Sequence, residues 1–230
     1  MILYFDFDGT IANTAPAVVQ AMQGAFRTHN LPVPLQARIV NAMGLALPSM
    51  VEGLAGKPLP PQKVAEIIQT YRALYAELPA AMITLFPGMK TLLERAHAHD
   101  MTMAIVTSKK TDALQRNLAD LGIAGLFSTL VGSDMTARHK PEPDPVEEAQ
   151  AQLGFPAGPE LVIGDSGYDM MMGRSAQLPT CGVTWGSQNA SALRQAGADY
   201  VATTPEELWD VIEAQAATPA ASAPRSGTPG

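Results

Sequence analysis

The sequence predicts an α/β fold: a Rossmann-like, doubly wound parallel sheet with a small all-helical subdomain inserted into it. Short apolar runs rich in β-branched residues alternate with one-sided, helix-like segments, and one long stretch has no strand pattern. Strands that alternate with helices indicate βαβ units, and therefore a parallel sheet with helices on both faces. At 230 residues the chain is long enough for one such domain and a small insert.

Individual elements follow from the spacing of apolar residues. Six short runs have the composition of buried strands: residues 2–5, 102–106, 129–131, 161–163, 180–183 and 200–202. Four segments between them repeat apolar residues every three or four positions, which is typical of helices with one buried face: residues 90–98, 111–121, 142–153 and 191–196.

Residues 14–80, called the insert below, interrupt this alternation. They are helix-like throughout, are broken by several prolines, and lie between the first strand and the rest of the sheet. We therefore expect a core domain of residues 1–13 and 81–215, with the insert as a helical cap subdomain. Residues 216–230 are rich in Ala, Pro, Ser, Thr and Gly, and we expect them to form a disordered tail.

Composition excludes several classes of function. The net charge of −7 argues against nucleic-acid and anionic-membrane partners, which reward a basic surface. A single cysteine, Cys181 in apolar surroundings, excludes an internal disulfide and a cysteine-rich zinc site, and we expect it in the core. No apolar run is long enough to cross a bilayer, and the apolar start has no basic leader, so we expect a cytoplasmic protein.

Polar residues recur where the expected strands end. The first strand runs into Asp6-Phe7-Asp8-Gly9-Thr10, the second into Thr107-Ser108-Lys109, and a later one into the segment from Gly164 to Asp169, while Lys140 follows the strand near Leu130. Ligands of doubly wound sheets bind outside the carboxyl ends of the strands. These four places are therefore expected to meet at one cleft.

The residue types at this cleft indicate a metal and a phosphate. Asp6, Asp8 and Asp165 cannot all stay ionised close together unless a cation relieves their repulsion. Ligands that are all oxygens favour Mg²⁺, and the Thr107 hydroxyl and Lys140 ammonium can bind phosphate oxygens. Each motif alone also fits a turn or a helix cap. Their joint placement at strand ends favours a phosphoryl-transfer site.

These four motifs resemble those of the haloacid dehalogenase (HAD) superfamily, over nearly the whole chain from Met1 to Ile212. The helical insert after the first motif is similar to that of the phosphoglycolate phosphatase-like branch. Phe86-Pro87-Gly88 and Val183-Thr184-Trp185-Gly186 add to this similarity. The motifs are specific for the superfamily and much less specific for the substrate.

The resemblance implies a role for each site residue in a Mg²⁺-dependent phosphatase. Asp6 would attack phosphorus and form an aspartyl-phosphate, and Asp8 would act as general acid and then general base. The side chains of Asp6 and Asp165 and the backbone carbonyl of Asp8 would hold Mg²⁺. The expected phosphate-binding residues are Gly9, Thr107, Ser108 and Lys140. Asp169 would orient metal-bound water or Lys140, with Thr10 as a further supporting residue.

Other positions carry weaker expectations. In the insert, the candidates for contacting the leaving group are Asn30, Arg38, Gly44 and Arg72. Lys109 matches a lysine that is often seen after the second motif, and we expect it at the surface. Met170, Met171 and Met172 are expected in the core. Asn13 stands where many relatives carry Asp, at the edge of the insert hinge.

Two alternatives to a phosphatase remain open. A sugar phosphomutase of the β-phosphoglucomutase type shares this core and insert, and no motif separates it from a hydrolase. A regulatory phospho-acceptor module also collects Asp, Thr and Lys around Mg²⁺, but its acceptor lies on a middle strand and it lacks a helical insert. The substrate is expected to be a small phosphorylated metabolite. Its identity and the oligomeric state are not predicted.

Overall fold

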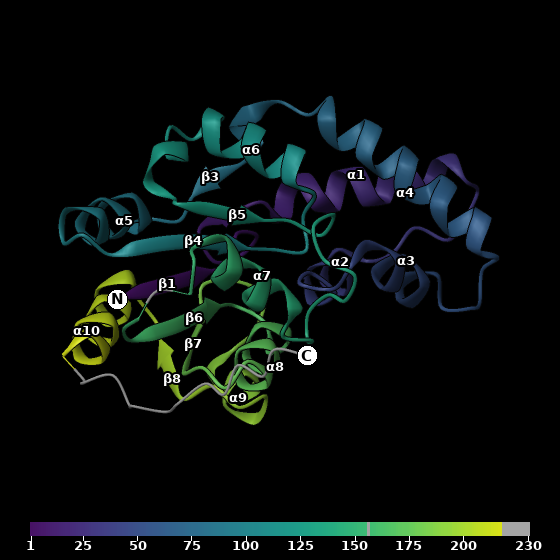
Figure 1. Ribbon diagram of the computed structural model, residues 1–230. Coiled ribbons are helices and arrows are strands. Elements are labelled where there is room, and N and C mark those ends of the chain that lie inside the picture. Colours follow the sequence, from purple (N-terminus) through teal and green to yellow (C-terminus); the bar gives the residue numbers. More distant parts are fainter. Residues whose placement is uncertain (156, 218–230) are drawn as a thin grey trace.

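A six-stranded parallel sheet forms the centre of the protein (Figure 1), in a computed structural model that describes residues 1–155 and 157–217. Its strand order is β5-β4-β1-β6-β7-β8, so the chain winds outward from β1 in both directions. The strands are β1 Ile2–Phe5, β4 Thr102–Val106, β5 Thr129–Val131, β6 Glu160–Gly164, β7 Thr180–Val183 and β8 Tyr200–Ala202. The predicted doubly wound sheet is confirmed, and β6 extends one residue beyond its predicted bounds at each end.

Alternating residues of each strand build two apolar layers. Leu3 and Phe5 belong to a core cluster with helices on one face of the sheet, and Ile2 and Tyr4 to a cluster on the opposite face. The first face is covered by α5 Met89–Ala98, α6 Thr111–Asp120 and α10 Pro205–Ala216. The second is covered by α7 Asp144–Gln152 and α8 Gly167–Ser175, with α9 Ala190–Gln195 against β7 and β8. Two short 3₁₀ helices, Ala80–Met82 and Ala124–Leu126, lie in connections.

The insert has its own apolar core. Its helices are α1 Ala15–Thr28, α2 Gln36–Asn41, α3 Leu47–Ala55 and α4 Pro61–Ala76. Phe26, Ile39 and Ile67 are fully buried among them, and Figure 1 shows the four helices beside the sheet. Pro48 and Pro61 lie in the first turns of α3 and α4, where a missing N–H costs nothing. Residues 14–80, all of which the structure describes, contain no strand, while the exact subdomain boundaries stay a prediction.

A two-stranded antiparallel pair closes the base of the insert. It consists of β2 Ala12–Asn13 and β3 Thr84–Leu85, which bring the two ends of the insert together. The sequence did not predict this pair, because two residues are too few to show an alternating pattern.

Several smaller expectations can be compared with the structure. Cys181, Met170 and Met172 are buried as predicted. The prediction for Met171 was wrong: its side chain is 39% exposed on the outer surface of α8. Helix α7 begins at Asp144 rather than at residue 142.

At the end of the chain, Ala216 is the last residue of α10. Residues 218–230 of the predicted tail lie outside the described residues. Over the described ranges, no helix is both long enough and apolar enough to span a bilayer.

Candidate active site

The strand register brings the predicted motifs to one edge of the sheet. Phe5 pairs with Ile105 of β4 and with Ile163 of β6. Because the three strands are parallel, Asp6, Thr107 and Asp165 leave the sheet on the same side, within two residues of these pairs. Lys140 reaches this edge from the connection between β5 and α7 and is almost fully buried.

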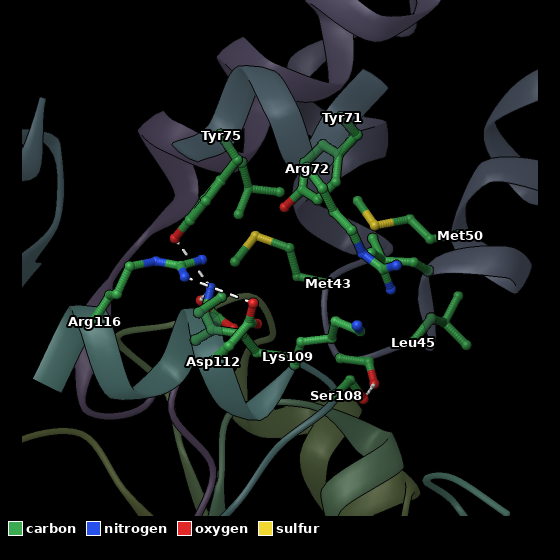
Figure 2. Close-up of a pocket in the computed structure, with 16 residues that line it drawn as sticks. Met43, Leu45, Met50, Tyr71, Arg72, Tyr75, Ser108, Lys109, Asp112 and Arg116 are labelled. Atoms are coloured by element: carbon green, nitrogen blue, oxygen red, sulfur yellow. Dashed lines mark hydrogen bonds and ion pairs between the residues drawn. The ribbon is translucent and has the colours of Figure 1, made fainter. Parts of the chain in front are cut away.

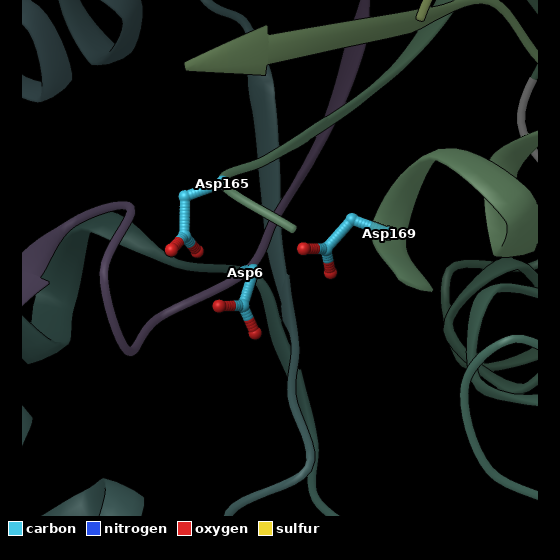
Figure 3. A group of neighbouring side chains, drawn as sticks. All are labelled: Asp6, Asp165 and Asp169. Carbon is cyan, nitrogen blue, oxygen red and sulfur yellow. The ribbon is translucent and has the colours of Figure 1, made fainter. Parts of the chain in front are cut away.

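Three buried carboxylates meet there (Figure 3). Asp6, Asp165 and Asp169 can each offer one oxygen such that all three oxygens lie within 4.8 Å of one another. The Lys140 ammonium donates to Oδ1 of Asp6 and to Oδ1 of Asp169, at 2.6 Å in both cases. One lysine therefore links the first motif to the fourth.

The second oxygen of Asp169 fixes the start of helix α8. Asp169 Oδ2 accepts hydrogen bonds from the Ser166 backbone N–H at 3.0 Å and from the Ser166 hydroxyl at 2.6 Å. This is a capping box, which satisfies backbone donors at the helix N-terminus. Asp169 thus holds Lys140 with one oxygen and its own helix with the other.

Asp165 is held by two neutral donors. Its Oδ1 accepts from the Thr10 hydroxyl at 3.1 Å, and its Oδ2 accepts from the Ser187 backbone N–H at 2.6 Å. Burial and the nearby Asp169 carboxylate nevertheless raise the pKa of Asp165 to about 6. Within the described ranges no basic side chain forms an ion pair with Asp165, so hydrogen bonds hold its carboxylate in place.

The cluster has the donor set and the charge that a divalent cation requires. Burial raises the pKa of Asp6 well above its usual range, against the opposing effect of Lys140. Burial alone would lower the pKa of Lys140, but its two aspartate partners keep that pKa above its usual value. With all three carboxylates ionised, the single ammonium would leave an excess of two negative charges in these buried surroundings, which a divalent cation would balance. All three donors are oxygens, which suits Mg²⁺.

The composition of this cluster differs from the predicted one in one respect. The sequence grouped the carboxylates of Asp6, Asp8 and Asp165, whereas the structure groups Asp6 and Asp165 with Asp169. The Asp8 carboxylate points instead to another lysine. Whether the Asp8 backbone carbonyl holds a metal stays a prediction.

The backbone at Gly9 passes close to the Asp165 carboxylate and leaves space for it. Gly9 has a φ of +90°, and a Cβ atom added there would lie 2.3 Å from Oδ2 of Asp165. Any side chain at this position would displace the carboxylate. This contact explains the glycine in the first motif, while its predicted binding of phosphate stays untested.

The prediction that Lys109 lies at the surface was wrong. Its side chain is 8% exposed, and its ammonium lies 2.9 Å from Oδ1 of Asp8. The same ammonium donates to the hydroxyl of Tyr75 on α4 at 3.0 Å (Figure 2). Burial alone would lower the pKa of Lys109, but the Asp8 carboxylate and the tyrosines of α4 raise it above its usual value. Lys109 therefore joins the first motif to the insert.

Next to this ion pair lies a cavity of about 160 Å³ between the insert and the core. Asp8, Ser108 and Lys109 line its core side, and Gly44 and Arg72 line its insert side (Figure 2). Of the four insert residues proposed to contact the leaving group, Gly44 and Arg72 are thus at the cavity and Asn30 and Arg38 are not. The Arg38 guanidinium donates to the Gly53 carbonyl at 2.8 Å instead.

The two polar residues after β4 have partners of their own. The Ser108 hydroxyl donates to the Gly44 carbonyl at 2.7 Å, so it links the core to the insert. The buried Thr107 hydroxyl accepts from the Lys109 backbone N–H at 3.3 Å. The phosphate contacts expected of Thr107 and Ser108 stay predictions.

Comparison with known proteins identifies a family for the chain. Residues 3–183 match the sequence profile of the haloacid dehalogenase-like hydrolases. The chain belongs to that family. The matched range contains the insert and all four motifs, so the resemblance drawn from the motifs is confirmed, together with the hydrolase class that it implied.

Individual relatives align along most of their length. A phosphoglycolate phosphatase of Yersinia pseudotuberculosis is 30% identical over 90% of this chain and 91% of its own. A pyrophosphatase, PpaX, of Halalkalibacterium halodurans is 26% identical over 92% of this chain and 96% of its own. The crystal structure of a hydrolase from Pseudomonas syringae has a TM-score of 0.84 at 26% identity, covering 94% of this chain and 99% of that one.

Within the family site, sequence reasoning missed two contacts. Ser187, whose N–H binds Asp165, directly follows the Val183–Gly186 motif, so a signal for its position was present. Tyr75 had only its helical spacing of four residues from Tyr71, which is equally typical of a structural aromatic pair. Its contact with Lys109 depends on how the insert meets the core.

Proposed function

We propose that this protein is a Mg²⁺-dependent phosphatase that hydrolyses a small phosphomonoester by way of a phosphorylated Asp6. The observation that carries the proposal is the Lys140 ammonium, 2.6 Å from Asp6, inside a buried cluster with excess negative charge. A buried carboxylate that is held but not fully neutralised is suited to attack phosphorus beside a cation. Relatives named as phosphatases support a phosphate substrate.

In the first half-reaction Asp6 is the nucleophile. Lys140 holds one oxygen of Asp6, and the other oxygen attacks phosphorus, so that an Asp6–phosphorus bond forms and the bond to the leaving oxygen breaks. Asp8, in its acid form, gives its proton to that oxygen. Lys140 and the Thr107 hydroxyl donate to the phosphoryl oxygens. Bound Mg²⁺ would supply the remaining positive charge, held by Asp6 and Asp165.

The second half-reaction releases phosphate. Water attacks the phosphorus of the aspartyl-phosphate while the Asp8 carboxylate takes a proton from it. The bond between phosphorus and Asp6 breaks, and inorganic phosphate leaves. Asp8 regains the proton that it gave up, so the site returns to its starting state.

A panel of phosphorylated metabolites, with and without Mg²⁺, tests the proposal. We expect hydrolysis that requires Mg²⁺ and that falls by at least about 1,000-fold in Asp6→Asn, since no amide oxygen can replace the nucleophile. Circular dichroism should show that the variant stays folded. Near-normal turnover by Asp6→Asn would exclude this mechanism. Conversion of β-glucose 1-phosphate into glucose 6-phosphate would identify a phosphomutase instead.

A further inference from the structure

The cavity beside Asp8 is where the alcohol part of a substrate would lie. In the proposed reaction, on which this inference rests, Asp8 protonates the leaving oxygen. The cavity opens from Asp8 toward the insert and away from the Asp6, Asp165 and Asp169 cluster. Its lining residues would therefore contact the leaving group rather than the phosphate.

The insert side of this cavity is apolar. Met43, Leu45, Leu47, Met50 and Tyr71 line it, and Figure 2 shows Met43 in the middle of the group, opposite Lys109. Met43 and Met50 are 5% and 3% exposed, so these side chains are part of the insert core and not mobile surface groups. A leaving group as small and polar as glycolate has no hydrocarbon surface to place against such a wall.

The residues that line the cavity carry a net positive charge, although Lys110 also interacts with the Asp134 carboxylate outside the lining. Lys109 and Arg116 are each in an ion pair with an aspartate that lines the same cavity. Arg72 and Lys110 also line it, and neither forms an ion pair with any residue in the described ranges. This local excess of two positive charges contrasts with a net charge of −7 for the chain. Arg72 is exposed, which places its charge at the mouth.

We propose that the leaving group is an amphipathic hydroxy acid: an aromatic or bulky aliphatic body with an anionic group at the end remote from the phosphate ester. Its body would contact Met43, Met50 and Tyr71, and its anion would pair with Arg72 at the mouth and with Lys110 of the cavity lining. Apolar contact and charge pairing then act together, so the preferred substrate needs both parts.

Three phosphate esters of primary alcohols separate the two parts. 2-Phosphoglycolate has the acid without the body, benzyl phosphate has the body without the acid, and 4-(phosphonooxymethyl)benzoate has both. All three leaving groups are primary alcoholates, so differences in kcat/KM report on recognition. We expect kcat/KM for the benzoate ester to exceed each of the others at least about tenfold. Equal or better hydrolysis of either simpler ester overturns the proposal.

Two arginine variants test the charged part. Arg72→Met keeps the side-chain stem and removes the charge, and the loss in kcat/KM should be about fivefold or more greater for the benzoate ester than for benzyl phosphate. Arg27→Met changes another exposed arginine of the insert, outside the cavity, and should alter neither. Equal losses on both esters in Arg72→Met would contradict recognition of the acid by Arg72.

Binding of the product alcohols separates this inference from the proposed function. By calorimetry, 4-(hydroxymethyl)benzoate should bind the intact protein more tightly than glycolate or benzyl alcohol, and Arg72→Met should weaken it. That order of affinities without hydrolysis of any ester would overturn the proposed function and support the cavity assignment. Hydrolysis that depends on Asp6, without that order of affinities, would support the proposed function and overturn the cavity assignment.

Discussion

Replacing Asp169 with Asn tests the double role of this carboxylate. One oxygen accepts the Lys140 ammonium and the other accepts two donors of Ser166. An asparagine side chain has one acceptor oxygen and one donor NH₂ group. Whichever way the amide is turned, its NH₂ faces either an ammonium or a backbone N–H. The variant therefore loses one of the two sides completely.

The size of this loss follows from burial. Asp169 and Lys140 are each about 1% exposed, so solvent cannot replace the missing contact. Because only one side is lost, the cost is that of an unsatisfied buried donor, about 1–3 kcal/mol, and more where the donor is charged, as the Lys140 ammonium is. We expect the free energy of unfolding to fall by about 3 kcal/mol. For a chain of this size that corresponds to a decrease in Tm of roughly 6–12 °C.

Urea unfolding in EDTA measures this change without a contribution from bound metal. Asp199→Asn is the matched control, because Asp199 accepts both Thr180 donors with a single oxygen, Oδ2, which an amide oxygen can replace. The control should lose about 1 kcal/mol or less. A loss of less than about 1 kcal/mol in Asp169→Asn, or a loss equal to that of the control, would refute the assignment of two separate roles.

Three further changes have defined outcomes. Gly9→Ala places a Cβ atom 2.3 Å from an oxygen of Asp165, at a residue whose φ is +90°. Mg²⁺-dependent turnover should therefore fall by at least about tenfold, and turnover equal to that of the wild type would contradict the close approach. Burial raises the pKa of Cys181 to about 12, so at pH 8 only about one thiol in ten thousand is ionised. A disulfide reagent should therefore label this thiol in urea but not in the folded protein, and fast labelling without urea would contradict this. Tyr75→Phe removes the tyrosine hydroxyl that accepts from the Lys109 ammonium, which should lower the free energy of unfolding by about 1–3 kcal/mol. The variant should lower kcat more than it changes the affinity for inorganic phosphate, and an unchanged kcat would show that the contact does not position Asp8 through Lys109.

The fold was largely predictable because its signals are local. Each strand of the sheet is a short apolar run, and strands β1, β4, β5, β7 and β8 have the predicted bounds. Two helices of the core domain, α8 and α10, were not among the predicted segments, and α7 begins two residues later than predicted. Helix α8 begins inside the fourth motif, where Gly167 and Asp169 have the composition of a loop although they form a capped helix. Pair β2 and β3 was missed because each strand has only two residues.

The site was predictable in its chemistry and less so in its contacts. Asp6, Lys140 and Asp165 were identified because polar residues after parallel strands must meet at one sheet edge. Lys109 was misplaced because an isolated lysine is most often a surface residue, and its burial depends on contacts with distant residues such as Tyr75, 34 positions away. The apolar character of the cavity was not foreseen, since Met43 and Met50 have the spacing of ordinary core residues.

The sequence by itself determined the sheet, the helical insert and the set of residue types that belongs to a phosphoryl-transfer site. Those properties depend on periodicity over a few residues and on which residues follow a strand. Only the tertiary structure decided which carboxylates form the cluster, with Asp169 in it and the Asp8 side chain paired to Lys109 instead. It also decided what the cavity beside Asp8 offers a leaving group. These contacts join residues far apart along the chain, for example Lys140 and Asp6, which are 134 positions apart, and no local pattern encodes such a separation.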